Sequence, residues 1–302
     1  MEEKREESFG RYKFILAAGV CLGLLGVTRK LVGADVSESA LVVGRALVTA
    51  LFIFALLALR GKLGELRIKR DDWSPFIALG ILFGGGMFLF FRALNYLSVD
   101  IIVLLDFITP VATSMLAMIF LKEKISKQSA LGIALALVGA SFVLHSGLTA
   151  SVDDRFLTGV LLELGAIAAF APIPLIIRYE EAHYPIVDIV FWPFLFAALF
   201  FVPIALIDGV VFVPSALAIG GIVALGVLGA LGYLNYDRML EKFEIHVGDS
   251  MMRIIVLFTA VISSFLLLGE VVDAITIVGG FVLIGASALI NKDAGRVPHR
   301  PH

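Results

Sequence analysis

The sequence predicts an all-α membrane protein of ten transmembrane helices, arranged as two inverted five-helix repeats around a central cavity. Three observations lead to this prediction. First, 60% of the 302 residues are hydrophobic and 17% are charged, with a mean hydropathy of +1.00, unlike a soluble domain. Second, the apolar residues form long unbroken runs, not the alternation of a barrel strand. Third, basic residues are abundant in every second connection, as in multi-pass proteins.

The membrane spans follow from the length of each apolar run. A helix crosses the hydrocarbon core with about 20 mostly apolar residues, and the connections between such runs are short. The expected spans are residues 12–31, 39–59, 73–97, 99–121, 128–146, 156–177, 185–207, 214–240, 247–268 and 274–290. Only Ser98 and Asp100 interrupt the apolar run formed by the third and fourth spans. Pro172 and Pro174 are expected to kink the sixth span, and Pro193 the seventh, because proline has no backbone N–H to donate.

Basic residues orient the chain, because cytoplasmic loops are rich in Lys and Arg. If the N-terminus is cytoplasmic, eighteen of the 24 basic residues fall in cytoplasmic segments, and the outer loops carry only Arg29, Lys30 and Arg155. We therefore expect a multi-pass protein of the cell inner (cytoplasmic) membrane with both termini in the cytoplasm. The charged residues 1–13 run directly into an apolar segment that is too long for a signal-peptide core, so we expect this first helix to be retained.

The two halves of the chain resemble each other. An offset of 146 residues (226 minus 80) pairs Gly80 with Gly226, Gly86 with Gly232 and Arg92 with Arg238, and one residue more pairs Glu123 with Glu270. Each half holds five spans, so the second repeat, residues 148–302, should be inverted in the membrane relative to the first, residues 1–147. Glu123 is then expected in the cytoplasm and Glu270 outside. Inverted repeats are typical of secondary transporters, which bind their substrates between the repeats.

Several classes of function lack their sequence signatures in this chain. Cys21 is the only cysteine, so neither a disulfide framework nor a cysteine metal site is expected. The net charge of −2 says little about partners, but the lack of a basic stripe argues against nucleic acid. The sequence has no GxxxxGK[ST] phosphate loop, no HExxH and no GxSxG. We therefore expect no enzyme, no catalytic residues, no metal and no cofactor.

Charged residues within the spans are candidate functional groups, because each costs at least about 2.5–3.5 kcal/mol at the centre of a membrane helix. Arg45, Arg92, Asp106 and Glu163 come from four different spans. At about 1.5 Å per residue, all four lie roughly 8–11 Å below the outer boundary. Two are positive and two are negative, so we expect them to converge on one another or on a water-filled cavity in the substrate path. The alternative is salt bridging between helices without substrate contact.

Three further residues complete the candidate substrate-binding and translocation set. Tyr233 and Asn235 are polar groups of the eighth span near the midplane, where they bind either substrate or neighbouring helices. Arg253 occupies the repeat position of Asp106 with the opposite charge. It also belongs to a set in the inner third of the membrane for which salt bridging and snorkelling are the favoured interpretation: Asp188, Asp237, Arg238, Asp249 and Arg253. The third, fourth, eighth and ninth spans should enclose the cavity with parts of the first, second, sixth and seventh, while the fifth and tenth pack away from it.

Short motifs along the chain resemble those of a known family. They are Gly26-Val-Thr-Arg-Lys30, Gly44-Arg45, Arg92-Ala-Leu-Asn-Tyr96, Thr109-Pro110-Val111, Leu121-Lys-Glu123 and Leu268-Gly-Glu270. With its two five-span halves, the chain resembles the EamA branch of the drug/metabolite transporter superfamily over residues 14–290. Leu25 and Leu257 depart from that pattern, which usually has an aromatic residue and a second proline there. The resemblance implies a ten-helix secondary transporter that exports amino acids or other small metabolites; distant branches exchange nucleotide sugars or triose phosphates.

The residues and the resemblance together predict a secondary transporter. We expect an exporter of amino acids or similar zwitterionic metabolites, with protons as the candidate coupling ion. The alternatives are an intramembrane enzyme acting on lipid or peptide, an exchanger of the nucleotide-sugar or triose-phosphate type, and a membrane scaffold. The inverted repeat favours transport, because enzymes and scaffolds need no second access state. The expected partners are a small-molecule substrate and the lipid bilayer, with the chain acting as a monomer or homodimer.

Overall fold

The computed structural model describes residues 2–33, 36–121, 127–150, 154–181, 183–208, 215–240 and 245–294. These described residues form helices and turns and contain no β-strand. In chain order the elements are α1 (Glu2–Val32), α2 (Glu38–Leu59), the 3-10 turns η1 (Leu63–Glu65) and η2 (Arg70–Asp72), α3 (Trp73–Ala93), α4 (Val99–Leu105), the 3-10 turn η3 (Asp106–Ile108), α5 (Thr109–Leu121), α6 (Lys127–Ala150), α7 (Asp154–Phe170), α8 (Ile173–Glu180), α9 (Ile186–Ile207), α10 (Ala216–Leu240), α11 (Ile245–Leu268) and α12 (Ala274–Ala294).

Most of these helices are long and strongly apolar. In the described part of the chain, seven segments have the length and composition to cross a membrane: Tyr12–Val32, Glu38–Leu59, Arg70–Ala93, Asp154–Ile177, Ile186–Ile207, Ala216–Tyr236 and Met251–Leu268. Shorter apolar helices, Ala130–Val143 and Ala274–Ala286, lie in the expected fifth and tenth spans. The all-helical fold is therefore confirmed, whereas the number of ten spans stays a prediction.

The expected fourth span is interrupted close to one of its charged residues. It consists of α4, η3 and α5, and the departure from α-helix begins at Asp106. Pro110 has no N–H to donate to the Asp106 carbonyl four residues before it. That carbonyl accepts a hydrogen bond from the Thr109 N–H instead, which is the tighter 3-10 pattern. A single proline thus explains why the segment is not one continuous α-helix.

The kink expected in the sixth span is confirmed. Pro172 separates α7 from α8, and the Leu175 N–H bonds to the Pro172 carbonyl. The Ala171 carbonyl therefore lacks its usual helical donor, and the Thr113 hydroxyl of α5 donates to it at 2.9 Å. This hydrogen bond joins the fourth span to the sixth, next to the break between α7 and α8. By contrast, α9 continues through Pro193 as one helix.

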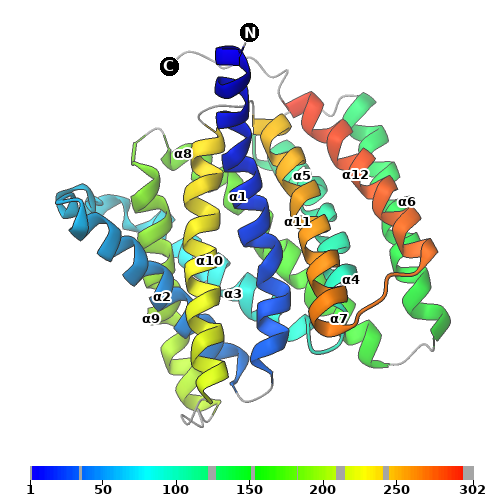
Figure 1. Ribbon diagram of the computed structural model, residues 1–302, viewed down its shortest axis with the longest axis horizontal. Coiled ribbons are helices and arrows are strands. Elements are labelled where there is room, and N and C mark those ends of the chain that lie inside the picture. Colours follow the sequence, from blue (N-terminus) through cyan, green and yellow to red (C-terminus); the bar gives the residue numbers. More distant parts are fainter. Residues whose placement is uncertain are drawn as a thin grey trace.

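The helices pack closely along one another (Figure 1). α6 and α12 lie together at one edge of the molecule, and α1 lies between α10 and α11. α2 packs on α9 and α10, and α3 contacts both α7 and α9. The start of α1 and the end of α12 lie at the same end of the molecule, which we call the terminal end, and the other is the opposite end. The expected fifth and tenth spans, α6 and α12, are therefore peripheral.

Glycines allow the close crossing of α1 and α11. A Cβ atom at Gly19 would come within 2.6 Å of the Ile255 Cβ, and one at Gly23 within 2.7 Å of the Val256 carbonyl oxygen. Helices in lipid associate through small residues of this spacing, because they let the backbones approach. The GxxxG pair of α1 therefore serves packing within the chain.

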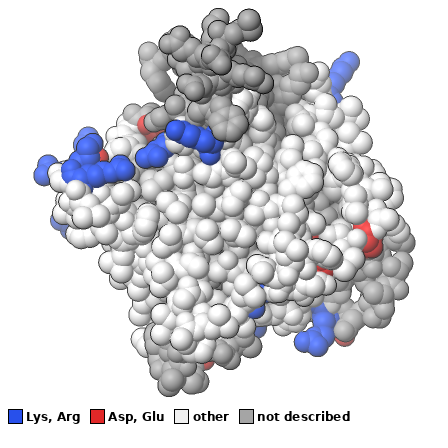
Figure 2. Space-filling view, in the orientation of Figure 1, with Lys and Arg blue, Asp and Glu red and all other residues white. Residues whose placement is uncertain are grey.

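The outer surface is apolar over a broad region. Figure 2 shows a face with few charged side chains across its middle, while most of the Lys and Arg side chains in view lie toward the terminal end and fewer lie toward the opposite end. Large apolar side chains are exposed on several helices, among them Leu51, Leu161, Leu199 and Phe281. Contiguous apolar surface of this kind is suited to a membrane rather than to water.

Candidate functional site

Arg45 is a buried charge at the contact between α2 and α10. Its side chain is 2% exposed, and its Cζ lies 5.8 Å from the centre of the Phe91 ring. The hydroxyl of Tyr233 on α10 lies near enough to the guanidinium to interact with it. Gly229, one turn before Tyr233, leaves room for it, because a Cβ there would lie 3.3 Å from Nη2. α10 thus presents a hydroxyl and a bare stretch of backbone to this arginine.

One edge of this guanidinium has no partner. Nε and Nη2 of Arg45 are buried, and neither makes a hydrogen bond to the protein. Leaving donors of a charged group unpaired in an apolar environment is costly. The same two atoms form the edge with which arginine binds a carboxylate through two parallel hydrogen bonds. The site therefore has two free donors that a carboxylate could accept from, and no described protein group fills that role.

A second buried charged group lies where α7 meets η3. Glu163 is completely buried, and neither of its carboxylate oxygens has a hydrogen-bond partner of normal length. The carboxyl group of Asp106 lies near enough to interact with it, and Arg253 of α11 acts electrostatically on Asp106. Asp106 also acts on Tyr233, which connects this group to Arg45. We call these five residues, Arg45, Asp106, Glu163, Tyr233 and Arg253, the central cluster.

Arg92 lies outside the central cluster. Its side chain is exposed, and its Cζ stands 5.8 Å from the centre of the Phe88 ring. The preceding residue, Phe91, is fully buried and faces Arg45. Successive residues of a helix point about 100° apart, so Arg92 faces away from the cluster. The expected convergence of four charged residues therefore does not include this one.

The other predicted polar residues are not gathered into the cluster either. The Asn235 amide donates a hydrogen bond within its own helix, to the Leu231 carbonyl at 2.7 Å. Asp188 is fully buried at the start of α9 and accepts a hydrogen bond from the Trp192 indole at 3.1 Å. The side chains of Asp237 and Asp249 lie outside the described residues, so the expected Asp249–Arg253 pair stays a prediction.

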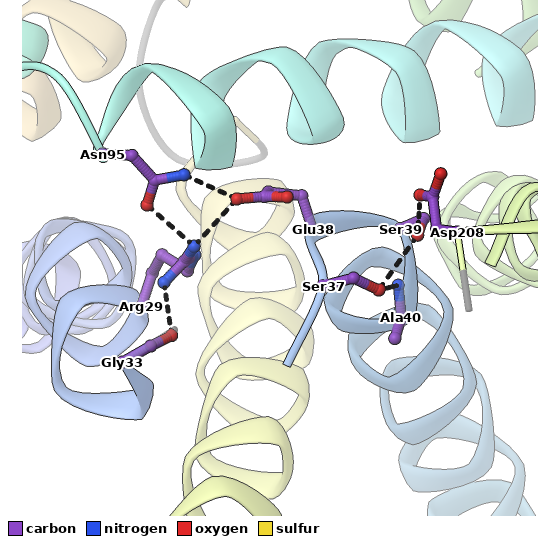
Figure 3. Close-up of polar contacts among 8 residues, drawn as sticks. All are labelled: Arg29, Gly33, Ser37, Glu38, Ser39, Ala40, Asn95 and Asp208. Atoms are coloured by element: carbon purple, nitrogen blue, oxygen red, sulfur yellow. Dashed lines mark hydrogen bonds and ion pairs between the residues drawn. The ribbon is translucent and has the colours of Figure 1, made fainter. Parts of the chain in front are cut away.

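At the opposite end of the bundle, polar side chains tie three helix ends together (Figure 3). Arg29, near the end of α1, is 3% exposed and donates to Glu38 at 3.3 Å and to Asn95 at 3.1 Å. Asn95, in the turn after α3, donates to Glu38 at 2.5 Å. Arg29 also donates to the Gly33 carbonyl at 3.0 Å. These contacts hold the end of α1, the start of α2 and the turn after α3 in one arrangement.

A second group of contacts lies at the same end. Lys30 forms an ion pair with Glu270 at 2.5 Å, and the other carboxylate oxygen of Glu270 accepts a hydrogen bond from the Val99 N–H at 2.9 Å. We call Arg29, Lys30, Glu38, Asn95 and Glu270 the opposite-end network. Sequence reasoning placed Lys30 and Glu270 on one side of the membrane but did not pair them. Their opposite charges on the same side of the membrane could have indicated that they form an ion pair.

Two apolar pockets in the described part of the chain do not include the central cluster. One, of about 390 Å³, is lined by Pro75, Leu116, Pro172, Leu175, Ile176, Tyr179 and Glu180. The other, of about 520 Å³, lies between α1 and α11 and is lined mainly by apolar side chains. Arg45 and Glu163 are 2% and 0% exposed, so solvent does not reach them in this conformation. The helices expected to enclose a substrate cavity are thus closed around these two charges.

Comparison with known proteins assigns the chain to a family. The model of the EamA-like transporter family matches residues 11–145 and 157–292. A protein of Haemophilus influenzae (strain ATCC 51907 / DSM 11121 / KW20 / Rd), named an uncharacterized transporter, is 22% identical over 301 residues, 96% of this chain and 97% of that protein. A crystal structure shares the fold with a TM-score of 0.68 at 15% identity, over 96% of this chain and 99% of that one. The chain belongs to the EamA-like transporter family and is a multi-pass membrane transporter rather than an enzyme.

Proposed function

We propose that this transporter exports amino acids or similar zwitterionic metabolites across the cytoplasmic membrane by proton-coupled secondary transport. The observation that carries the proposal is the central cluster, in which the Nε and Nη2 atoms of Arg45 lack hydrogen-bond partners and the buried carboxyl group of Glu163 has, among the described residues, only the carboxyl group of Asp106 beside it. Unpaired charges at this depth are costly. A ligand that carries both a carboxylate and an ammonium group would pair with both.

The chemistry of the cluster suits such a substrate. Its carboxylate would lie on the free edge of Arg45, since a guanidinium binds a carboxylate through two parallel hydrogen bonds. Its ammonium group would lie against Glu163. The rings of Phe83 and Phe194 pack on Tyr233, with centroids 5.6 Å and 5.5 Å away, and would form an apolar wall for the rest of the molecule.

The carboxyl pair of Asp106 and Glu163 provides a candidate proton site. The two groups interact, and Arg253 acts on Asp106. Neighbouring carboxyl groups titrate as a pair, so the pair can hold one proton between its two members. The ammonium group of an arriving substrate would favour release of that proton. The proton and the substrate would then occupy the Asp106–Glu163 pair in turn. Such alternating occupancy couples proton movement to substrate transport.

Two inverted repeats, residues 1–147 and 148–302, would supply the two access states. The family match in two separate stretches supports this division. So does the packing, because helix pairs recur under the repeat: α1 with α10 corresponds to α7 with α3, and α3 with α9 corresponds to α10 with α2. Asp106 and Arg253 are 147 residues apart (253 minus 106), hold corresponding positions and interact. A two-fold axis that relates two repeats brings residues at corresponding positions together when they lie close to the axis.

The test is counterflow of radiolabelled amino acids in proteoliposomes. We expect Arg45→Ala to lower the transport of carboxylate substrates about tenfold or more, because a charge-assisted hydrogen bond contributes about 1.5–3 kcal/mol, and to affect amines without a carboxylate less. Arg92→Ala is the matched control, since that arginine is exposed, and should transport like the parent. A parent protein that transports no amino acid, or two variants that behave alike, would refute the proposal.

A further inference from the structure

We propose that the opposite-end network is a gate that closes the substrate path at that end. In this proposal the path opens when Lys30 separates from Glu270, and when Arg29 separates from Glu38 and Asn95. The inference rests on the transport function proposed above, and it adds the residues that control access to the central cluster.

The position of the network supports a gate. Glu38 opens α2, the helix that carries Arg45, and Glu270 follows α11, the helix that carries Arg253. Glu270 also holds the N–H of Val99, the first residue of the span that carries Asp106. Three of the helical segments that supply the cluster are therefore tied together at the same end. Separating their ends would open a path along the helices to the cluster.

The chemistry of the network favours contacts that break and re-form. In the Lys30–Glu270 pair the side chains are 22% and 17% exposed, and Asn95 is exposed. When these partly exposed contacts separate, water replaces the lost hydrogen bonds, so their net cost of opening is small. Arg29 is 3% exposed, so water reaches its guanidinium only once the helix ends have moved apart. The central cluster differs, because Arg45 and Glu163 are sealed from solvent and need another partner when they are exposed.

Glu270 is the residue of the network that joins the two halves of the chain. One carboxylate oxygen accepts from Lys30 at the end of α1, and the other accepts from the backbone at the start of α4. The residue itself follows α11. Its side chain therefore joins three segments, two from the first half of the chain and one from the second. Loss of this single carboxylate should loosen the contact between the halves at this end.

A cross-link tests whether these ends must separate. Cysteines at Lys30 and Glu270, in a Cys21→Ala background, would be joined with a short bifunctional thiosulfonate reagent. We expect bridging to reduce amino-acid counterflow at least tenfold and a reductant to restore it. The matched control is a cysteine pair at Lys62 and Glu65, a local ion pair of 2.7 Å in which the side chains are 56% and 43% exposed. Bridging the control pair should leave transport unchanged.

A second measurement needs no substrate. The rate at which a maleimide labels Thr49→Cys reports access to the cluster, because Thr49 is fully buried one turn from Arg45. We expect Glu270→Gln to raise this rate several-fold at an unchanged unfolding temperature, and Glu65→Gln not to. Full transport by a protein shown to be bridged between residues 30 and 270 would overturn the gate and leave the transport function standing. Equal labelling in Glu270→Gln and the parent would also overturn it, even if no amino acid proved to be a substrate.

Discussion

At the scale of single residues, Glu163 allows the proton site to be tested with little disturbance. Glu163→Gln removes the ionisable group and keeps the shape, and the amide can still donate a hydrogen bond to Asp106, the carboxyl group with which Glu163 interacts. We expect an unfolding temperature in detergent within a few degrees of the parent. The pH dependence of transport, measured as initial rates over about three pH units, should disappear. A variant that keeps the parent's pH profile would show that another group carries the proton.

Counting residues along the spans grouped charged side chains that interact, but it could not give their direction around a helix. Counting residues placed Arg45, Asp106 and Glu163 at one level, and the structure brings all three into the central cluster. The same count placed Arg92 at that level, yet Arg92 faces outward because Phe91 takes the buried direction. Phe91 and Arg92 are adjacent and lie at nearly the same depth, so a residue count cannot tell which of the two faces the core.

The repeat predicts a relation between Asp106 and Arg253 that the depth count does not. Arg253 was placed in the inner third of the membrane, away from Asp106, although the repeat gave the two residues corresponding positions. The structure places Arg253 where it acts on Asp106. The inner level of Arg253 stays a prediction, because a residue count places the Cα atom and leaves out the reach of a long arginine side chain.

At the scale of helices, two glycines should respond oppositely to the same substitution. A Cβ at Gly23 would come within 2.7 Å of a backbone oxygen of α11, whereas one at Gly85 of α3 would meet no atom within 4 Å. Gly23→Ala should therefore lower the free energy of unfolding by about 1–3 kcal/mol through overpacking. Gly85→Ala should raise it by up to about 1 kcal/mol, because alanine favours helix over glycine. Thermal unfolding in detergent measures both, and equal shifts would contradict the close crossing.

The interruptions of the helices show what a proline pattern can predict. Pro172 and Pro174 lie close together, and their span breaks into α7 and α8 as expected. Pro193 lies within a long apolar helix that continues through it. Pro110 produces a 3-10 turn that was not expected. A missing donor is certain from the sequence, but whether the helix tightens, breaks or continues depends on the partners that neighbouring helices offer, as Thr113 does for the sixth span.

At the scale of the whole molecule, the fold places its costly charges between the two halves of the chain. Arg45 and Asp106 belong to the first half, whereas Glu163, Tyr233 and Arg253 belong to the second. The peripheral helices α6 and α12 pack on each other and contribute none of these residues. A site built from both halves changes whenever the halves move relative to each other. This arrangement connects the position of the cluster to the two access states that transport needs.

The distribution of basic residues predicts which end of the molecule faces the cytoplasm. More of the basic side chains in view lie toward the terminal end than toward the opposite end, and cytoplasmic loops are rich in Lys and Arg, so the terminal end should face the cytoplasm. Glu123 was expected there but lies outside the described residues, and the exposed Lys62 can take its place as a probe. Val271, 78% exposed beside Glu270, marks the opposite end. In a Cys21→Ala background, an impermeant thiol reagent should label Val271→Cys in intact cells and Lys62→Cys only after permeabilisation. The reverse pattern would place the termini outside, and labelling of both in intact cells would contradict the membrane-spanning arrangement between them.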